Sequence, residues 1–222
     1  ILTPSSLEEL RLETEKMAKE KPDYICIAGG DGTLHLTLTS ILNSYKKQPV
    51  PPILILKEGT MDNVARTIKL KGRGPQLLKR LVDKIDKGEE IELHRRYTIQ
   101  VKDKFCFLFG TGFVTNFLNL AYTGTEKGFV RNLQVAFMAM KEGLLNITNG
   151  AIFSKTECQI YCDDRALDCN FYYGLLAGTV EHIGMGFSPL PEAVAEKKFQ
   201  IIASSLEPRK LAFNINKIRT GK

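Results

Sequence analysis

Apolar positions in the first ninety residues follow helical and strand-like spacing in turn. Residues 5–20 have apolar side chains three or four residues apart, which predicts a helix with one inward face, formed by Leu7, Leu10, Thr14, Met17 and Ala18. The pattern Ser5-x-x-Glu8 predicts a capping box at its start. Short apolar runs at 24–28 and 53–56 are typical of strands buried on both faces of a sheet.

Further helices are predicted between and after these strands. They cover residues 34–44, 61–69 and 76–87, and the inward side chains of the third are Leu77, Leu78, Leu81, Val82 and Ile85. Helices that alternate with strands indicate an α/β layer with a parallel sheet. We therefore predict an α/β domain over residues 1–92.

The pattern changes near Glu92, where strand-like runs begin to dominate. Two hairpins are predicted, one from 96–101 and 105–110 and one from 157–162 and 166–173. Further strands are expected at 174–181 and 198–203, and a helix at 127–142. This pattern predicts a second domain over residues 93–222, an antiparallel β-sandwich with one or two helices.

Composition changes this picture little. A formal charge of +6 favours anionic partners, although an ordinary solvated surface explains it equally well. No long Lys/Arg block is present, so nucleic acid is not expected as a partner. No apolar run reaches the roughly 18 residues of a membrane span.

The five cysteines show no C-x-x-C spacing and no neighbouring histidine that would complete a zinc site. They predict reduced, mostly buried thiols and a cytoplasmic protein. Cys158 and Cys162 would share one face of a strand, where core packing is the expected role.

The candidate chemistry lies at Gly29-Gly30-Asp31-Gly32-Thr33, between a strand and a helix. Glycines let a phosphate approach the backbone, and the free N–H groups of the next helix form an anion site. Thr33 would cap that helix or bind a phosphate oxygen. The alternative is a glycine-rich turn in which Asp31 only caps the helix. The loop matches neither a Walker A nor a dinucleotide fingerprint.

Asp31 would repel phosphate unless a metal ion or a substrate hydroxyl lay between them. Two roles remain open for it: a Mg²⁺-linked carboxylate, or a general base that takes a proton from an acceptor hydroxyl.

This loop, followed by a second segment Gly59-Thr60-Met61-Asp62-Asn63-Val64-Ala65-Arg66, resembles the diacylglycerol kinase, sphingosine kinase and bacterial lipid kinase family. The stretch Gly184 to Ala193 resembles a later segment of that family more weakly. The resemblance implies that residues 1–92 are a nucleotide-binding α/β domain for ATP and that residues 93–222 are a β-sandwich substrate or lipid domain. It also implies an active site in the cleft between them.

By this resemblance, ATP would contact a set of residues from both motifs and the N-terminal segment: Thr3, Gly29, Gly30, Asp31, Gly32, Thr33, Leu34, His35, Gly59 and Thr60. Asp31 matches an acidic residue expected to be catalytic. Leu36 stands where the family has Glu, and Lys197 stands about where a structural metal site has Asp. The metal ligands are therefore unknown.

The family's first strand and its C-terminal return segment are not found, so we expect the chain to be a fragment. The predicted function is an ATP- and Mg²⁺-dependent kinase for diacylglycerol or a similar lipid alcohol. It would be cytoplasmic and peripherally bound to membranes, with a homodimer possible. The alternatives are a non-catalytic nucleotide- or lipid-binding homologue and, ranked lower, an NAD kinase-like enzyme.

Overall fold

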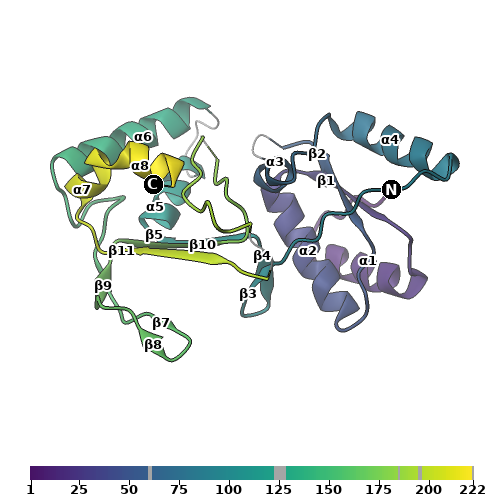
Figure 1. Cartoon of the computed structure of the whole chain (residues 1–222), viewed down its shortest axis with the longest axis horizontal. Coiled ribbons are helices and arrows are strands. Elements are labelled where there is room, and N and C mark those ends of the chain that lie inside the picture. The colour runs from purple at the N-terminus through teal and green to yellow at the C-terminus, as the bar shows by residue number, and fades with distance from the viewer. Residues whose placement is uncertain (60–61, 123–128, 185, 195–196, 222) are drawn as a thin grey trace. The chain divides into compact units, whose positions relative to one another are not determined.

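The computed structural model describes residues 1–59, 62–122, 129–184, 186–194 and 197–221. They form two compact units that divide between Phe107 and Leu108, with a short stretch at 197–198 grouped with the first unit (Figure 1). Each unit is described by itself below.

The first unit begins with alternating helices and strands. Its elements are α1 (Leu7–Glu20), β1 (Ile25–Gly29), α2 (Asp31–Tyr45), β2 (Ile53–Lys57), α3 (Asn63–Thr67), α4 (Gly74–Asp86), β3 (Ile99–Val101) and β4 (Lys104–Cys106). Strands β1 and β2 pair in parallel, with Ile25 opposite Ile53 and Gly29 opposite Lys57. The predicted α/β order and parallel pairing are confirmed.

Helices α1 and α2 pack through a small polar cluster as well as apolar side chains. The buried Thr14 hydroxyl lies 2.7 Å from the Ser40 hydroxyl and 3.0 Å from that of Ser44. Leu34, Leu38 and Ile41 on α2 are buried in the apolar core of this unit. The inner face of α1 is formed by Thr14 and Ala18, whereas Leu7, predicted to point inward, is exposed.

Three local predictions for this unit were wrong. The predicted capping box of α1 does not form: Ser6 is the N-cap and accepts the Glu9 N–H, whereas Glu9 accepts the N–H of Ser5, the residue before the cap. Strand β1 is buried on one face only, with Cys26 and Ala28 exposed, because α2 packs on β1 and the described residues leave its other face open. On α4 only Leu77 of the five predicted inward side chains is buried; Leu78, Val82 and Ile85 are exposed.

The first predicted hairpin is confirmed in part: β3 and β4 pair and pack on α2, but residues 108–110, predicted as the end of its second arm, belong to a separate strand of the second unit. Thr39 Oγ1 accepts the Phe105 N–H at 3.0 Å and donates to the Phe105 carbonyl at 3.1 Å. Asn43 Nδ2 donates to the Asp103 carbonyl in the turn. These bonds join the hairpin to the helix that follows the glycine loop.

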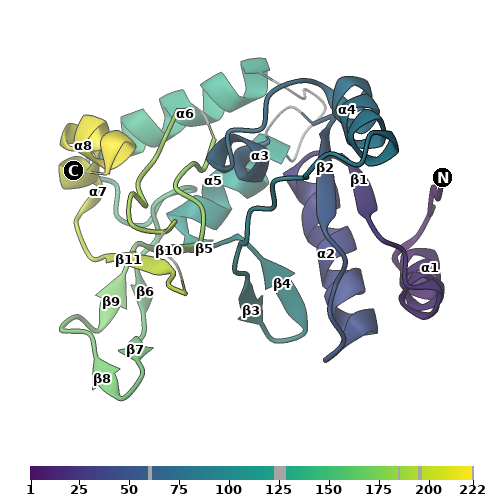
Figure 2. The same cartoon turned by 45° about the vertical axis from the view of Figure 1, so that its right-hand side comes forward.

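The second unit contains a three-stranded antiparallel sheet, a ribbon and four helices in its described residues. The elements are β5 (Leu108–Gly112), α5 (Phe113–Tyr122), α6 (Phe129–Leu144), β6 (Thr156–Glu157), β7 (Tyr161–Cys162), β8 (Arg165–Ala166), β9 (Phe171–Tyr172), β10 (Gly174–Gly178), β11 (Gln200–Ser204), α7 (Pro208–Phe213) and α8 (Ile215–Thr220). The sheet order is β11-β10-β5. The pairs β6–β9 and β7–β8 form the predicted second hairpin (Figure 2).

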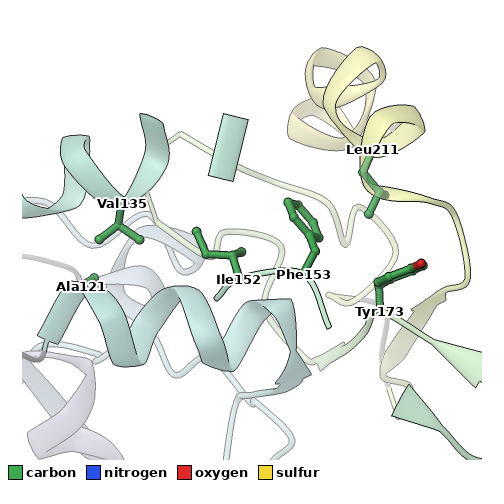
Figure 3. Packing of buried hydrophobic residues seen from close by; sticks show 6 residues of the cluster. All are labelled: Ala121, Val135, Ile152, Phe153, Tyr173 and Leu211. Atoms are coloured by element: carbon green, nitrogen blue, oxygen red, sulfur yellow. The ribbon is translucent and has the colours of Figure 1, made fainter. Parts of the chain in front are cut away.

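The core of the second unit lies between α5, α6, the α6–β6 loop and α7. Figure 3 shows its buried side chains, Ala121, Val135, Ile152, Phe153, Tyr173 and Leu211. The carboxylate of Glu142, buried on α6, accepts the N–H groups of Ala151, Ile152 and Phe153 at 2.9–3.0 Å. This carboxylate holds the loop that delivers two of the core side chains.

Several expectations for this half change. Helices α5, α7 and α8 were not predicted, and the described strands form one three-stranded sheet and a ribbon, so the sandwich layout stays a prediction. Most cysteines are not buried: Cys26, Cys158 and Cys162 are exposed and only Cys106 is buried. The core role predicted for Cys158 and Cys162 was therefore wrong, because their ribbon lies outside the core of the sheet. In the described residues, no helix combines the length and apolar character needed to cross a membrane.

Candidate nucleotide-binding site

The candidate site is formed by two loops that leave the carboxyl ends of the parallel strands β1 and β2. Gly29 ends β1 directly opposite Lys57 at the end of β2, and the Glu58 N–H donates to the Gly29 carbonyl at 3.4 Å. In open α/β sheets this edge is where ligands bind. The pairing therefore brings both glycine motifs to one place.

At two of the glycines, Gly29 and Gly59, neighbouring atoms leave no room for a side chain. Gly29 has φ +153°, and a Cβ there would lie 2.5 Å from the Thr33 Cβ. A Cβ on Gly59 would overlap the Cα of Gly30 in the other loop. The two motifs touch through their main chains, and only glycine permits this contact.

Helix α2 starts at Asp31, three residues before the predicted start at Leu34. Its first intrahelical bond runs from the Leu34 N–H to the Gly30 carbonyl at 2.9 Å. The N–H groups of Asp31, Gly32 and Thr33 come before this bond and therefore have no acceptor within the helix. Gly32 is exposed, and a Cβ there would meet nothing within 4 Å. A 15-residue helix with open first-turn donors is a suitable anion site.

The Asp31 carboxylate points to the second motif and caps α3. Its Oδ2 accepts the Asn63 main-chain N–H at 3.1 Å and the Asn63 Nδ2 at 2.9 Å, and the carboxylate also accepts the Val64 N–H. Asp62, the residue at the N-cap of α3, makes no side-chain cap bond. Asp31 therefore satisfies the first donors of a helix that cannot cap itself.

Burial raises the pKa of Asp31 above its ordinary value. The hydrogen bonds from Asn63 and Val64 lower this pKa, and the negative charge of Asp62 raises it, but burial has the largest effect. The two carboxylates are thus close enough to repel each other. A cation between them would relieve that repulsion.

The other predicted residues take different places. Thr33 is exposed at the open end of α2, His35 is half-buried one turn on, and the Leu34 side chain is buried in the core. Thr3 is exposed in the segment before α1, and none of the hydrogen bonds found for the described residues joins it to the loop. Thr60 falls outside the described residues.

Two functional candidates were missed in the sequence. Asn63 is buried, holds Asp31, and has an Oδ1 with no hydrogen-bond partner among the described atoms. Lys57 places a cation at the end of β2 and donates to the Leu70 carbonyl at 3.3 Å. The available signal for Asn63 was its place in the second motif, between Gly59 and Arg66.

The arrangement can bind a polyphosphate and a divalent cation. The open N–H groups of α2 suit phosphate oxygens, and Mg²⁺ commonly uses one or two carboxylates together with substrate phosphates. Asp31 and Asp62 provide such a pair, although the described residues contain no cluster of three or more metal-ligating side chains. The residues present fit ATP with Mg²⁺ better than a metal held by protein alone.

Residues 3–91, which contain both loops, match the family model of the diacylglycerol kinase catalytic domain. This segment is thus similar to the diacylglycerol kinase catalytic domain. It ends inside the first unit, so the second unit is compared through its fold alone.

Solved structures share that fold. A diacylglycerol kinase from Bacillus anthracis str. Sterne matches at a TM-score of 0.62 and 14% identity, over 98% of this chain and 67% of the other. A protein provisionally assigned as a diacylglycerol kinase from the same organism matches at a TM-score of 0.64 and 15% identity, over 100% of this chain and 68% of the other. At these identities the likeness establishes the diacylglycerol kinase-like fold and no more.

A search of curated protein sequences found no match. The chain spans about two thirds of the length of the structures that share its fold.

Proposed function

We propose that this protein is an ATP-dependent kinase that phosphorylates a hydroxyl group of diacylglycerol or a similar lipid. One observation carries the proposal: the open N-terminus of α2 at Gly32 is held against the second motif, where Gly59 contacts Gly30. A phosphate chain placed there would meet main-chain donors without meeting a side chain.

In this proposal the α2 N–H groups of Gly32 and Thr33 hold ATP phosphates, and Thr60 and Thr3 remain predicted contacts. Asp31 and Asp62 would hold Mg²⁺, which when bound neutralises charge on the transferring phosphoryl group. Asn63 fixes the Asp31 carboxylate through two donors. Because this carboxylate has a raised pKa, it is also suited to accept the proton of the acceptor hydroxyl.

The cell compartment and the oligomeric state also belong to the proposal. We expect a cytoplasmic protein that meets its lipid at a membrane surface, and a homodimer remains a possible state. Nucleic acid is not an expected partner.

The test compares lipid phosphorylation by the wild-type chain and by Asp31→Asn, with ATP, Mg²⁺ and a diacylglycerol. We expect transfer by the wild type and at least a hundredfold loss in the variant, in line with the loss of a catalytic acid–base group. Asp23→Asn, which changes an exposed carboxylate just before β1, is the matched control and should keep full activity.

The alternative function is a non-catalytic nucleotide- or lipid-binding homologue, favoured by Leu36 and Lys197 at positions where the family has carboxylates. Calorimetric ATP binding by the wild type without transfer to any lipid alcohol would establish this alternative. Transfer to NAD in place of lipid would instead establish the lower-ranked NAD kinase-like activity.

A further inference from the structure

Helix α6 turns its apolar side to the solvent. Side chains spaced three and four residues apart along one face are 38% to 73% exposed, with Phe137 the most exposed: Val130, Leu133, Phe137, Met140 and Leu144. A surface helix normally faces the core with such a stripe and the solvent with polar residues. Here the relation is reversed.

The opposite face of α6 is already packed, so the helix cannot turn its stripe inward. Val135 is buried in the core cluster, and Glu142 is bonded to the loop at 151–153. A Cβ on Gly143 would lie 2.8 Å from the Cβ of Ala212 on α7. In both views α6 lies at the margin of its unit (Figures 1 and 2), and α7 packs against it.

The charges on these helices are almost all positive. Helices α6, α7 and α8 carry six cations, Arg131, Lys141, Arg209, Lys210, Lys217 and Arg219. Their one carboxylate, Glu142, is buried and bonded to main-chain N–H groups. Lys141 is exposed and follows Phe137 by one helical turn, so it borders the stripe directly.

We propose that the outer face of α6 docks on a lipid bilayer that contains anionic headgroups. Apolar side chains on a helix with basic neighbours are the chemistry that binds such an interface: the stripe enters the acyl boundary and the cations meet the phosphates. The proposal deepens the proposed function, because it names the surface through which the enzyme meets a membrane-borne substrate.

A second copy of the chain fits this surface less well. Two stripes packed together would bring cations near cations with no exposed carboxylate on α6 to pair with them. The helix is also about 24 Å long and about 10 Å wide, which is small against the roughly 800 Å² per partner of a stable interface.

The test is co-sedimentation of the 222-residue chain with vesicles of phosphatidylcholine, with and without phosphatidylglycerol, in the absence of ATP. We expect binding to the anionic vesicles, and a roughly tenfold loss in Phe137→Gln and in Leu133→Gln, because each removes a large apolar group from the interface. Lys141→Glu should weaken binding roughly fivefold on anionic vesicles only. Leu7→Gln, which changes an exposed leucine on α1, is the matched control and should bind as the wild type does.

The proposal fails if the wild type does not sediment with anionic vesicles, or if Phe137→Gln binds them as well as the wild type does. It also fails if light scattering shows that the wild type is a dimer and that Phe137→Gln is a monomer. Circular dichroism checks that each variant keeps its fold. The binding readout needs no catalysis, so it separates this proposal from the kinase. If the kinase is also active, Phe137→Gln should lose activity on vesicles and keep it on a short-chain, water-soluble diacylglycerol.

Discussion

Gly32 lies in the first turn of α2 and Gly59 in the loop after β2, and different constraints act on them. Gly59 has the Cα of Gly30 where a Cβ would stand, whereas Gly32 has open space. The first glycine is required by the contact between the loops. Under the proposed function, the second leaves room for the phosphates in front of α2.

Alanine substitutions separate these two constraints. We expect Gly59→Ala to destabilise the protein by about 1–3 kcal/mol, as overpacking does. Gly32→Ala should leave stability unchanged or raise it by up to about 1 kcal/mol, and yet weaken ATP binding. Urea unfolding and calorimetric ATP titration measure the two effects, and equal loss of stability in both variants would contradict this assignment.

Asp31 predicts a pH dependence of stability. Its pKa in the folded state is raised above the 3.8 of the unfolded chain, so the folded state binds more protons between these two values. This contribution to stability is full below the unfolded pKa and is lost as pH rises through the folded pKa.

We therefore expect the free energy of unfolding of wild type minus that of Asp31→Asn to fall as pH rises from about 4 toward neutrality. Near neutral pH the variant should be at least as stable as the wild type, because it lacks a buried charge, although it loses activity. Urea unfolding at several pH values gives the difference. A difference that grows with pH would mean that the Asn63 and Val64 hydrogen bonds outweigh burial.

At the scale of elements, single side chains complete helix ends and loops that the backbone leaves open. Asp31 caps α3 from another loop, and Glu142 of α6 holds the loop at 151–153. Thr39 likewise joins the β3–β4 hairpin to α2. In each case a polar group on a helix satisfies main-chain donors or acceptors of a segment distant in sequence.

Glu142 provides the sharpest test at this scale. Glu142→Gln keeps the shape but leaves at least one buried main-chain donor poorly paired, so we expect a loss of about 2–4 kcal/mol in the free energy of unfolding. Glu157→Gln, with a side chain 82% exposed, is the control and should stay within about 0.5 kcal/mol. Thermal or urea unfolding compares them, and equal effects would refute the role given to Glu142.

At the scale of the whole molecule, each unit has buried residues of its own. Ile41 and Leu190, both fully buried, belong to the first and second unit respectively. Truncating either side chain leaves a cavity, which typically costs about 2–5 kcal/mol.

We predict that Ile41→Ala speeds amide hydrogen exchange mainly in residues 1–107, and Leu190→Ala mainly in residues 108–222. Exchange measured by mass spectrometry on both variants shows where protection is lost. A uniform rise along the chain in either variant would mean that the two units unfold as one.

The sequence by itself determined the elements whose signals are local. The strand, glycine loop and helix around residues 25–45, most of the two hairpins and the helix at 129–144 all follow from residue spacing and turn chemistry, and the glycine motifs pointed to the candidate site. The short helices α7 and α8 were not predicted, because six residues are too few to show a helical spacing of apolar side chains.

Tertiary structure alone decided which faces are buried and which polar groups meet. The pattern of apolar residues on α4 and α6 specifies an amphipathic helix, but not whether another element covers its apolar face; on α6 that face is exposed. Asn63 meets Asp31 only because parallel pairing brings the ends of β1 and β2 together. The spacing of apolar side chains depends on one helix or strand alone, whereas burial and capping depend on contacts with other segments of the chain.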